Sequence, residues 1–169
     1  MEQKPMTLTD ALIDRAAEEG MDSLLNVFIH RYLEVTGGVM NAQTMPLLNG
    51  WQHTLLGYHF FREEVNEGGF VQLIQNGYGP YIFDNPFAKA MKLMGEKEFA
   101  DLVYDARRIY QAHRQELEKD CTEDEFMAMY EQYEAFDDLE ERFMDMEEEL
   151  TERLAAYVEA HREQFMEGM

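Results

Sequence analysis

The stretch "EEVNEGGFVQLIQNGYGPY", residues 63–81, interrupts the helical spacing of the chain with a cluster of glycine, asparagine and proline. Gly68 and Gly69 can take a positive φ without steric cost, so they are predicted to reverse the chain after a preceding helix. The apolar residues from Phe70 to Ile74 would then fold back onto that helix as a short helix of their own. The stretch therefore predicts a tight arrangement of short helices in the middle of the chain.

Apolar residues on both sides of this stretch recur at helical spacing, and alternating runs of β-branched residues are absent. The predicted helices cover about residues 9–19, 24–36, 44–66, 70–74, 86–94, 96–119, 122–133 and 137–165. The fold class is therefore predicted to be all-α, a single compact domain of six to eight helices with a long acidic C-terminal helix. Residues 1–43 are expected to form an N-terminal helical segment that packs on a helical domain of residues 44–169.

Cap and stop residues set several of these limits. Thr7 or Thr9 is predicted to cap the first helix. The stretch "TEDEF" is predicted to form a capping box, with Thr122 as the N-cap residue and Glu125 three residues on. Asn85 and Pro86 are predicted as N-cap and first residue of a helix that ends at Gly95. Pro46 is tolerated in the first turn of helix 44–66, whose buried face is predicted to hold Leu47, Leu48, Trp51, Leu55, Tyr58, Phe61 and Val65.

The net charge is −21, from 35 acidic and 14 basic residues. Such a charge repels nucleic acids and anionic membranes and attracts cationic partners, so direct nucleic-acid binding is not expected. No apolar run approaches the roughly 20 residues needed to cross a bilayer. The single cysteine, Cys121, fits a reducing compartment, and the acidic N-terminus lacks a signal-peptide core, so a cytoplasmic protein is predicted.

Motifs for metal binding and catalysis are missing from the sequence. Di-metal helical bundles use Glu-x-x-His pairs, and none of the five histidines has a glutamate three residues before it. Carboxylates surround Cys121 and disfavour its thiolate, and there is no nucleophile elbow or phosphate-binding glycine loop. We predict a non-enzymatic protein with no catalytic, cofactor-binding or metal-binding residues, and an unrecognised enzyme or metal protein stays open as an alternative.

Residues 136–154, "FDDLEERFMDMEEELTERL", hold nine carboxylates and two arginines. An apolar seam at heptad-like spacing predicts a packed helix: Phe136, Leu139, Phe143, Met146, Leu150, Leu154 and Tyr157. With about 1.5 Å of rise per residue, residues 137–152 carry roughly one net negative charge per 3 Å, close to the phosphate spacing of about 3.4 Å along one DNA strand. Acids in two rows would support DNA mimicry, whereas an even spread would support only solubility.

Residues 63–81 followed by residues 88–106 resemble the core of a bacterial DNA-mimic protein family, and the resemblance covers roughly residues 44–165. That core has a helix ending in a Val-Asn-x-Gly-Gly-Phe-x-Gln turn, an Asn-x-x-Gly-x-Tyr loop, an Ala-rich helix ending in Gly, and a further helix. The matching positions are Val65, Asn66, Gly68, Gly69, Phe70, Gln72, Asn76, Gly79, Tyr81, Ala88, Ala90, Leu93, Gly95, Ala100 and Ala106. The resemblance implies an all-α, often dimeric protein whose acidic surface occupies the DNA-binding face of a transcription factor or similar protein.

The predicted function is therefore binding to a basic, DNA-binding partner protein, with consequences for transcription. The predicted contact residues are the nine acids of the C-terminal helix: Asp137, Asp138, Glu140, Glu141, Asp145, Glu147, Glu148, Glu149 and Glu152. The alternative is an immunity-type or regulatory protein that binds one cognate partner by shape as well as charge. Met127, Met129, Met144 and Met146 bear on that alternative, because methionine-rich surfaces can bind partners, although methionine at helical spacing more often lies in a core.

Overall fold

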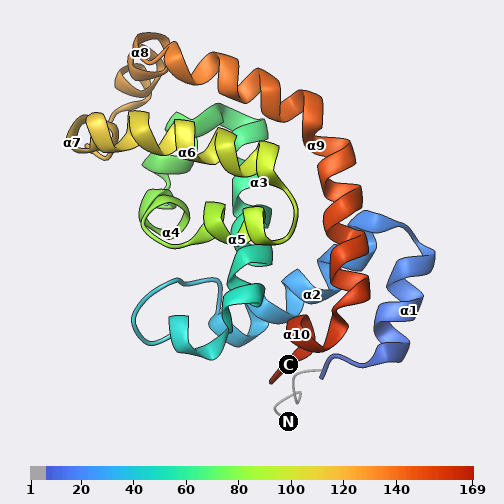
Figure 1. Cartoon of the computed structure of the whole chain (residues 1–169). Helices are drawn as coiled ribbons and strands as arrows, with labels where there is room; N and C mark the ends of the chain where they lie inside the picture. The colour runs from blue at the N-terminus through green and yellow to red at the C-terminus, as the bar shows by residue number, and fades with distance from the viewer. Residues whose placement is uncertain (1–6) are drawn as a thin grey trace. The chain divides into compact units, whose positions relative to one another are not determined.

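The computed structural model describes residues 7–169, and all regular structure in this range is helical (Figure 1). Ten α-helices and one 3₁₀ turn, η1, follow one another there, so the all-α prediction is confirmed. The described chain divides into two compact units. Unit 1 holds the residues up to Leu56 together with Glu149–Met169, and unit 2 holds Gly57–Glu148. The expected division at residue 43 stays a prediction.

Unit 1 contains α1 (Asp10–Glu18), α2 (Met21–Thr36), η1 (Met45–Leu47), the start of α3 (Gly50–Gln75), the end of α9 (Ala135–Ala160) and α10 (Arg162–Met166). Its core is aromatic: Phe28 lies 6.4 Å from Phe165 between ring centroids, and the Tyr32 hydroxyl donates to the Phe165 carbonyl at 2.6 Å. As predicted, Thr9 caps α1, where its side chain accepts from Leu12 N–H. The contacts of Phe28 and Tyr32 with Phe165 join α2 to α10 within unit 1.

The third helix begins later than the sequence predicts. Residues 45–47 form the 3₁₀ turn, and α3 starts at Gly50 rather than near residue 44. Asn49 and Gln52 explain the start, because each side chain accepts a hydrogen bond from the other residue's backbone N–H, at 2.8 and 2.9 Å. Leu47 consequently falls outside the helix and is 48% exposed, so its predicted burial is wrong.

Unit 2 contains the rest of α3, α4 (Gly79–Phe83), α5 (Phe87–Leu93), α6 (Lys97–Ala112), α7 (Arg114–Leu117), α8 (Glu123–Gln132) and the first half of α9. Phe61, fully buried, lies at the centre of its core. Its ring is 4.9 Å from Phe143 and 5.1 Å from Phe99 between centroids, both edge-on. This edge-to-face packing contributes about 0.5–1.5 kcal/mol per pair beyond the area buried, and it fixes α9 against α3 and α6.

The predicted reversal in α3 occurs at Gly68 and Gly69. Gly69 has φ +75°, as predicted, whereas Gly68 leaves the helix with φ −146°. Beyond them, fully buried Phe70 packs 5.5 Å from Phe61 and 5.1 Å from Phe136 between ring centroids. The glycine pair thus folds the chain back on its own helix, and it brings α3 against the start of α9.

Helix breaks at two histidines raise the helix count in residues 7–169 above the predicted six to eight. Predicted helix 96–119 is divided into α6 and α7 at His113, and predicted helix 137–165 into α9 and α10 at His161. Both residues have φ near −128° and leave helical geometry. Asn85 also differs from its predicted N-cap role, because its amide donates to the Pro80 and Tyr81 carbonyls and so closes α4.

Candidate protein-binding surface

The apolar seam of α9 determines which of its acids reach solvent. Phe136, Leu139 and Phe143 are buried in unit 2, and Leu150 and Leu154 are buried in unit 1, so the predicted seam is confirmed at five of its seven residues. The other two, Met146 and Tyr157, are half-buried. Seven of the nine candidate acids lie on the outer side of the helix and are exposed: Asp137, Asp138, Glu141, Asp145, Glu148, Glu149 and Glu152. The other two, Glu140 and Glu147, face the interior of unit 2.

Glu140 is a structural residue of the glycine turn. It is 6% exposed, and its carboxylate accepts a hydrogen bond from the Phe70 backbone N–H at 2.9 Å and another from the Tyr130 hydroxyl at 3.4 Å. Burial raises the pKa of its carboxyl group, the nearby charge of Asp137 adds to the increase, and the two hydrogen bonds oppose it. Glu140 therefore holds the turn and presents little charge to a partner.

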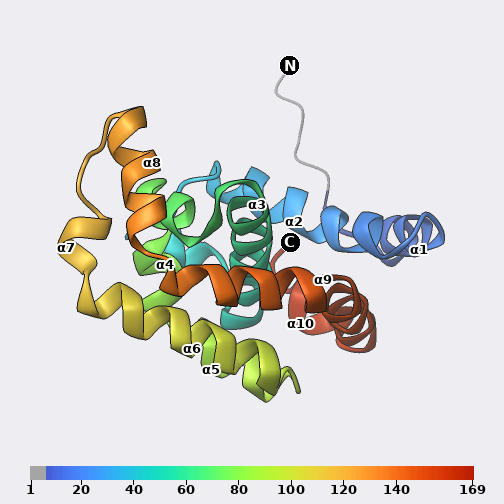
Figure 2. The same cartoon turned by 90° about the horizontal axis from the view of Figure 1, so that it is seen from above.

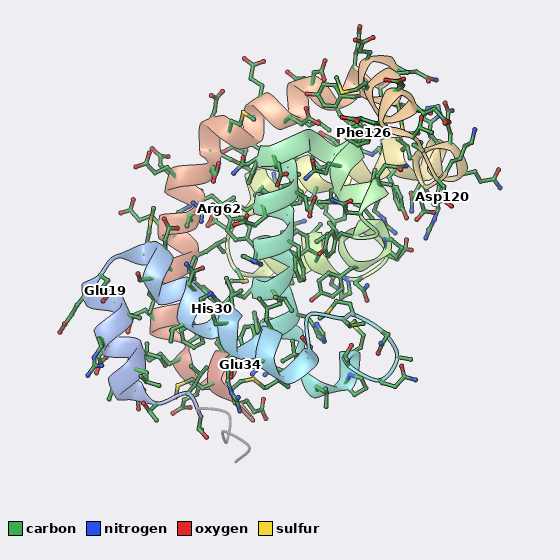
Figure 3. All side chains as sticks on the ribbon, turned by 180° about the vertical axis from the view of Figure 1, so that it is seen from behind. Glu19, His30, Glu34, Arg62, Asp120 and Phe126 are labelled. Atoms are coloured by element: carbon green, nitrogen blue, oxygen red, sulfur yellow. The ribbon has the colours of Figure 1, made fainter. Side chains whose placement is uncertain are left out.

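Glu147 lies seven residues after Glu140 on α9, on the same side of the helix. Its Oε1 accepts from Arg62 Nε at 2.7 Å and from the Asn66 amide at 2.9 Å, and both donors lie on α3. Figure 3 labels Arg62. The Glu147 side chain is 20% exposed. This ion pair neutralises much of the Glu147 charge and joins α9 to α3 within unit 2.

Their spacing in the sequence distinguishes these two acids from the rest. Glu140 follows Phe136 by four residues and precedes Phe143 by three, and Glu147 stands in the same relation to Phe143 and Leu150. Residues at these spacings share a face of a helix, so both glutamates border the buried seam. Sequence reasoning could have found them from this position.

A second row of acids runs along α6, at the side of α9. Glu98 and Asp101 are exposed, and Asp105 follows at helical spacing. Arg142 connects the rows, because its Nη1 lies 3.9 Å from carboxylate oxygens of both Asp105 and Asp138. Figure 2 shows α6 beside the first half of α9, and the Phe99 and Phe143 rings meet at 5.9 Å beneath the acids. Unit 2 thus carries two neighbouring rows of carboxylates on helices whose buried aromatic side chains pack against each other.

Two methionines interrupt the acidic surface of unit 2 with apolar groups. Met144 on α9 is 54% exposed and Met127 on α8 is 55% exposed, whereas Met129 is buried. The interpretation of methionines at helical spacing as core residues therefore holds for Met129 and is wrong for the other two. Met144 lies between Glu141 and Glu148, so the outermost row of acids on α9 is not continuous.

Three other features of residues 7–169 concern metal binding, the cysteine and membrane-spanning helices. No group of three or more histidine, cysteine or acidic side chains there is arranged to hold a metal ion. The Cys121 thiol donates to the Lys119 carbonyl at 3.2 Å, on the loop before α8. None of the helices described has the length and apolar character to span a bilayer.

An all-α fold with an aromatic core and rows of outward carboxylates defines a class of acidic helical proteins. Within it, the chain belongs to the DMP19-like protein family, whose model matches residues 46–161. The predicted resemblance to a DNA-mimic family is thereby confirmed. The chain is also 35% identical over 96 residues to the DNA mimic protein DMP19 of Neisseria meningitidis serogroup B. That match covers 57% of this chain and 58% of the relative's own length.

Proposed function

We propose that the chain binds the basic DNA-binding surface of a partner protein and competes there with DNA. The observation that carries this proposal is the pair of acid rows on α6 and α9. Packed helices lie about 8–10 Å apart, and the grooves of B-DNA are about 6 and 12 Å wide. Rows of carboxylates on neighbouring helices therefore have a separation on the scale of phosphates across a groove. Family membership and the DNA mimic DMP19 add support.

The proposed footprint consists of exposed acids of unit 2 only: Glu98 and Asp101 on α6, and Asp137, Asp138, Glu141, Asp145 and Glu148 on α9. Glu149 and Glu152, the other two exposed acids predicted on α9, belong to unit 1 and are proposed as separate contacts. Glu140 and Glu147 support this surface from within. Because the aromatic core fixes both helices, the acids are held in place before a partner binds, which lowers the entropic cost of association. In this proposal the protein acts by binding, in the cytoplasm, as a regulator of transcription.

Affinity capture from native lysate tests the proposal. The bait is the full chain, and the retained proteins are identified at low and high salt and after addition of duplex DNA. We expect a basic DNA-binding protein that salt releases and duplex DNA displaces, because charged contacts are screened and both ligands occupy one surface. A partner retained unchanged at high salt, or one that binds duplex DNA at the same time, would contradict the proposal.

Two variants with the same net charge test whether the position of the neutralised acids matters for binding, or only the total charge of the protein. One variant carries Asp137→Asn, Glu141→Gln, Asp145→Asn and Glu148→Gln, and the control neutralises four exposed acids elsewhere, Glu18, Glu63, Glu131 and Glu163. We expect the first to weaken binding of the captured partner by at least about tenfold and to flatten the salt dependence, while the control changes it by less than about threefold. Equal losses would mean that net charge alone attracts the partner.

A second candidate function follows from Met127 and Met144. An immunity-type or regulatory protein would bind one partner by shape as well as charge, and exposed methionines beside acids suit such a contact. In that case Met127→Ala together with Met144→Ala would weaken binding more than the four neutralised acids, and binding would persist at high salt.

A further inference from the structure

A cavity of about 330 Å³ lies in unit 2 where the segment after α4, helix α5 and helix α6 meet. One part of its wall is apolar and well buried, formed by Ile82, Phe83 and Val103. The polar part is formed by Asn85, Lys89, Tyr104 and Arg107, together with Asp84. The cavity is at the lower end of the size range of small-molecule sites, about 300–1,000 Å³, and five of its ten wall residues are polar or charged.

Arg107 is the unusual residue in this wall. Its Nε is buried and has no hydrogen-bond acceptor among residues 7–169. Its sequence neighbour Arg108 instead pairs with Asp105 at 2.5 Å. A partly buried guanidinium with unused donors, in a chain of 35 acidic residues, indicates that an acceptor from outside the chain completes its hydrogen bonds.

The charges around the cavity favour an anion. Asp84 is its only acidic wall residue, and both oxygens of Asp84 are bound by Arg114, at 3.1 and 2.8 Å. Arg114 also binds Glu118 at 2.9 Å, so it compensates only part of the Asp84 charge. The cavity wall itself holds two positive charges, Lys89 and Arg107, against the one negative charge of Asp84. Unit 2 as a whole has 23 acidic and 9 basic residues, a difference of −14, so the cavity is an electropositive spot on a negative body.

We propose that this cavity binds a small organic monocarboxylate. The planar guanidinium of Arg107 matches the two oxygens of a carboxylate, and Lys89 adds a second positive charge. The apolar wall accepts the body of the ligand, which requires a carboxylate with a short hydrocarbon or aromatic part. A single negative charge is preferred, because each further charge is repelled by the acids of unit 2.

Arginine-detected NMR and calorimetry on the full chain test the site with benzoate as the probe. We expect benzoate to shift the Arg107 Nε–H resonance saturably, and the neutral analogue benzyl alcohol and inorganic phosphate to leave it unshifted. Arg107→Gln should raise the Kd for benzoate at least about tenfold, since a charge-assisted hydrogen bond is lost, whereas Arg108→Gln should leave it unchanged.

Three results would overturn the proposal: no saturable shift with benzoate, an equal response to benzyl alcohol or phosphate, or equal Kd values for Arg107→Gln and Arg108→Gln. If Arg107→Gln does not fold, as judged by circular dichroism, the Kd for benzoate is measured for Lys89→Gln instead and compared with that of the wild type. That variant should raise the Kd at least about threefold, because it removes one of the two attracting charges, and an unchanged Kd would count against the site.

Discussion

The carboxylate of Glu140 accepts a hydrogen bond from the backbone N–H of Phe70 at 2.9 Å, across 70 residues of sequence. The donor follows the Gly68–Gly69 turn of α3, and the acceptor belongs to the acidic helix α9. The two features therefore form one structure, in which the turn holds the first half of α9 and its outward acids.

The turn should be intolerant of a side chain at Gly69. Its φ of +75° disfavours any other residue, and an added Cβ would collide with the Glu140 carboxylate. We expect Gly69→Ala to lower the free energy of unfolding by about 2–4 kcal/mol, from backbone strain and overpacking together. Urea denaturation measures the loss. The control is Gly77→Ala, with φ +90° and open space around the Cβ, which should lose only the strain of about 1–2 kcal/mol.

Glu140 should make stability depend on pH. Because its folded pKa is raised above the ordinary carboxyl value, its contribution is fully present below that ordinary value and is lost as pH rises through the folded pKa. Glu140→Gln keeps an acceptor for Phe70 N–H and cannot ionise. We expect the variant to gain stability relative to the wild type between about pH 4 and pH 7, measured by urea denaturation across that range. A difference that stays constant with pH would contradict this assignment.

The Arg62–Glu147 ion pair should contribute to stability more than the surface acids of the same helix. Both side chains are largely covered, and their atoms approach to 2.7 Å. We expect Glu147→Gln to lower the free energy of unfolding by about 1 kcal/mol, with a coupling energy of at least 0.5 kcal/mol in a double-mutant cycle with Arg62→Gln. Asp138→Asn is the control: its side chain is 79% exposed and its nearest arginine nitrogen is 3.9 Å away, so it should change stability by less than about 0.5 kcal/mol.

Arg162 should hold α1 within unit 1. Its terminal nitrogens bind Asp10 at 3.3 Å and Asp14 at 2.7 Å, both on α1, and it also pairs with Glu159. We expect Arg162→Gln to increase amide hydrogen exchange in α1 by about threefold to tenfold while exchange in unit 2 stays the same. The control is Arg15→Gln, which removes an arginine charge on α1 itself. Equal exchange of α1 amides in the two variants would contradict the proposal that Arg162 holds α1.

Sequence reasoning succeeded where a local signal determines the structure. The Thr122–Glu125 capping box, the stop at Gly95 and the seam of α9 all appear as predicted, because each depends on residues within a few positions of one another. The breaks at His113 and His161 were missed, since histidine carries no strong signal for ending a helix. There the packing of the following segment, including buried Leu117 and Phe165, outweighs helix propensity.

The candidate site was harder to predict, because which face of α9 is outward depends on tertiary contacts. The acidic composition identified the correct helix but could not separate Glu140 and Glu147, which bond to α3, from the exposed acids. The α6 row was missed for a similar reason: Glu98, Asp101 and Asp105 are ordinary acids of an amphipathic helix. The packing of Phe99 on α6 against Phe143 on α9 brings that row beside α9, and Arg142 lies within 3.9 Å of Asp105 there.

The adjacent acid rows also affect the protein when it is alone. Carboxylates fixed side by side repel one another, and Arg142 and Arg108 offset only part of that repulsion. Dissolved salt screens the repulsion, so it should raise the melting temperature of the free protein while it weakens an electrostatic complex. A basic partner would act as a bound counterion and reduce the repulsion between the carboxylates. The acidic protein should therefore have a higher melting temperature in the complex than in isolation.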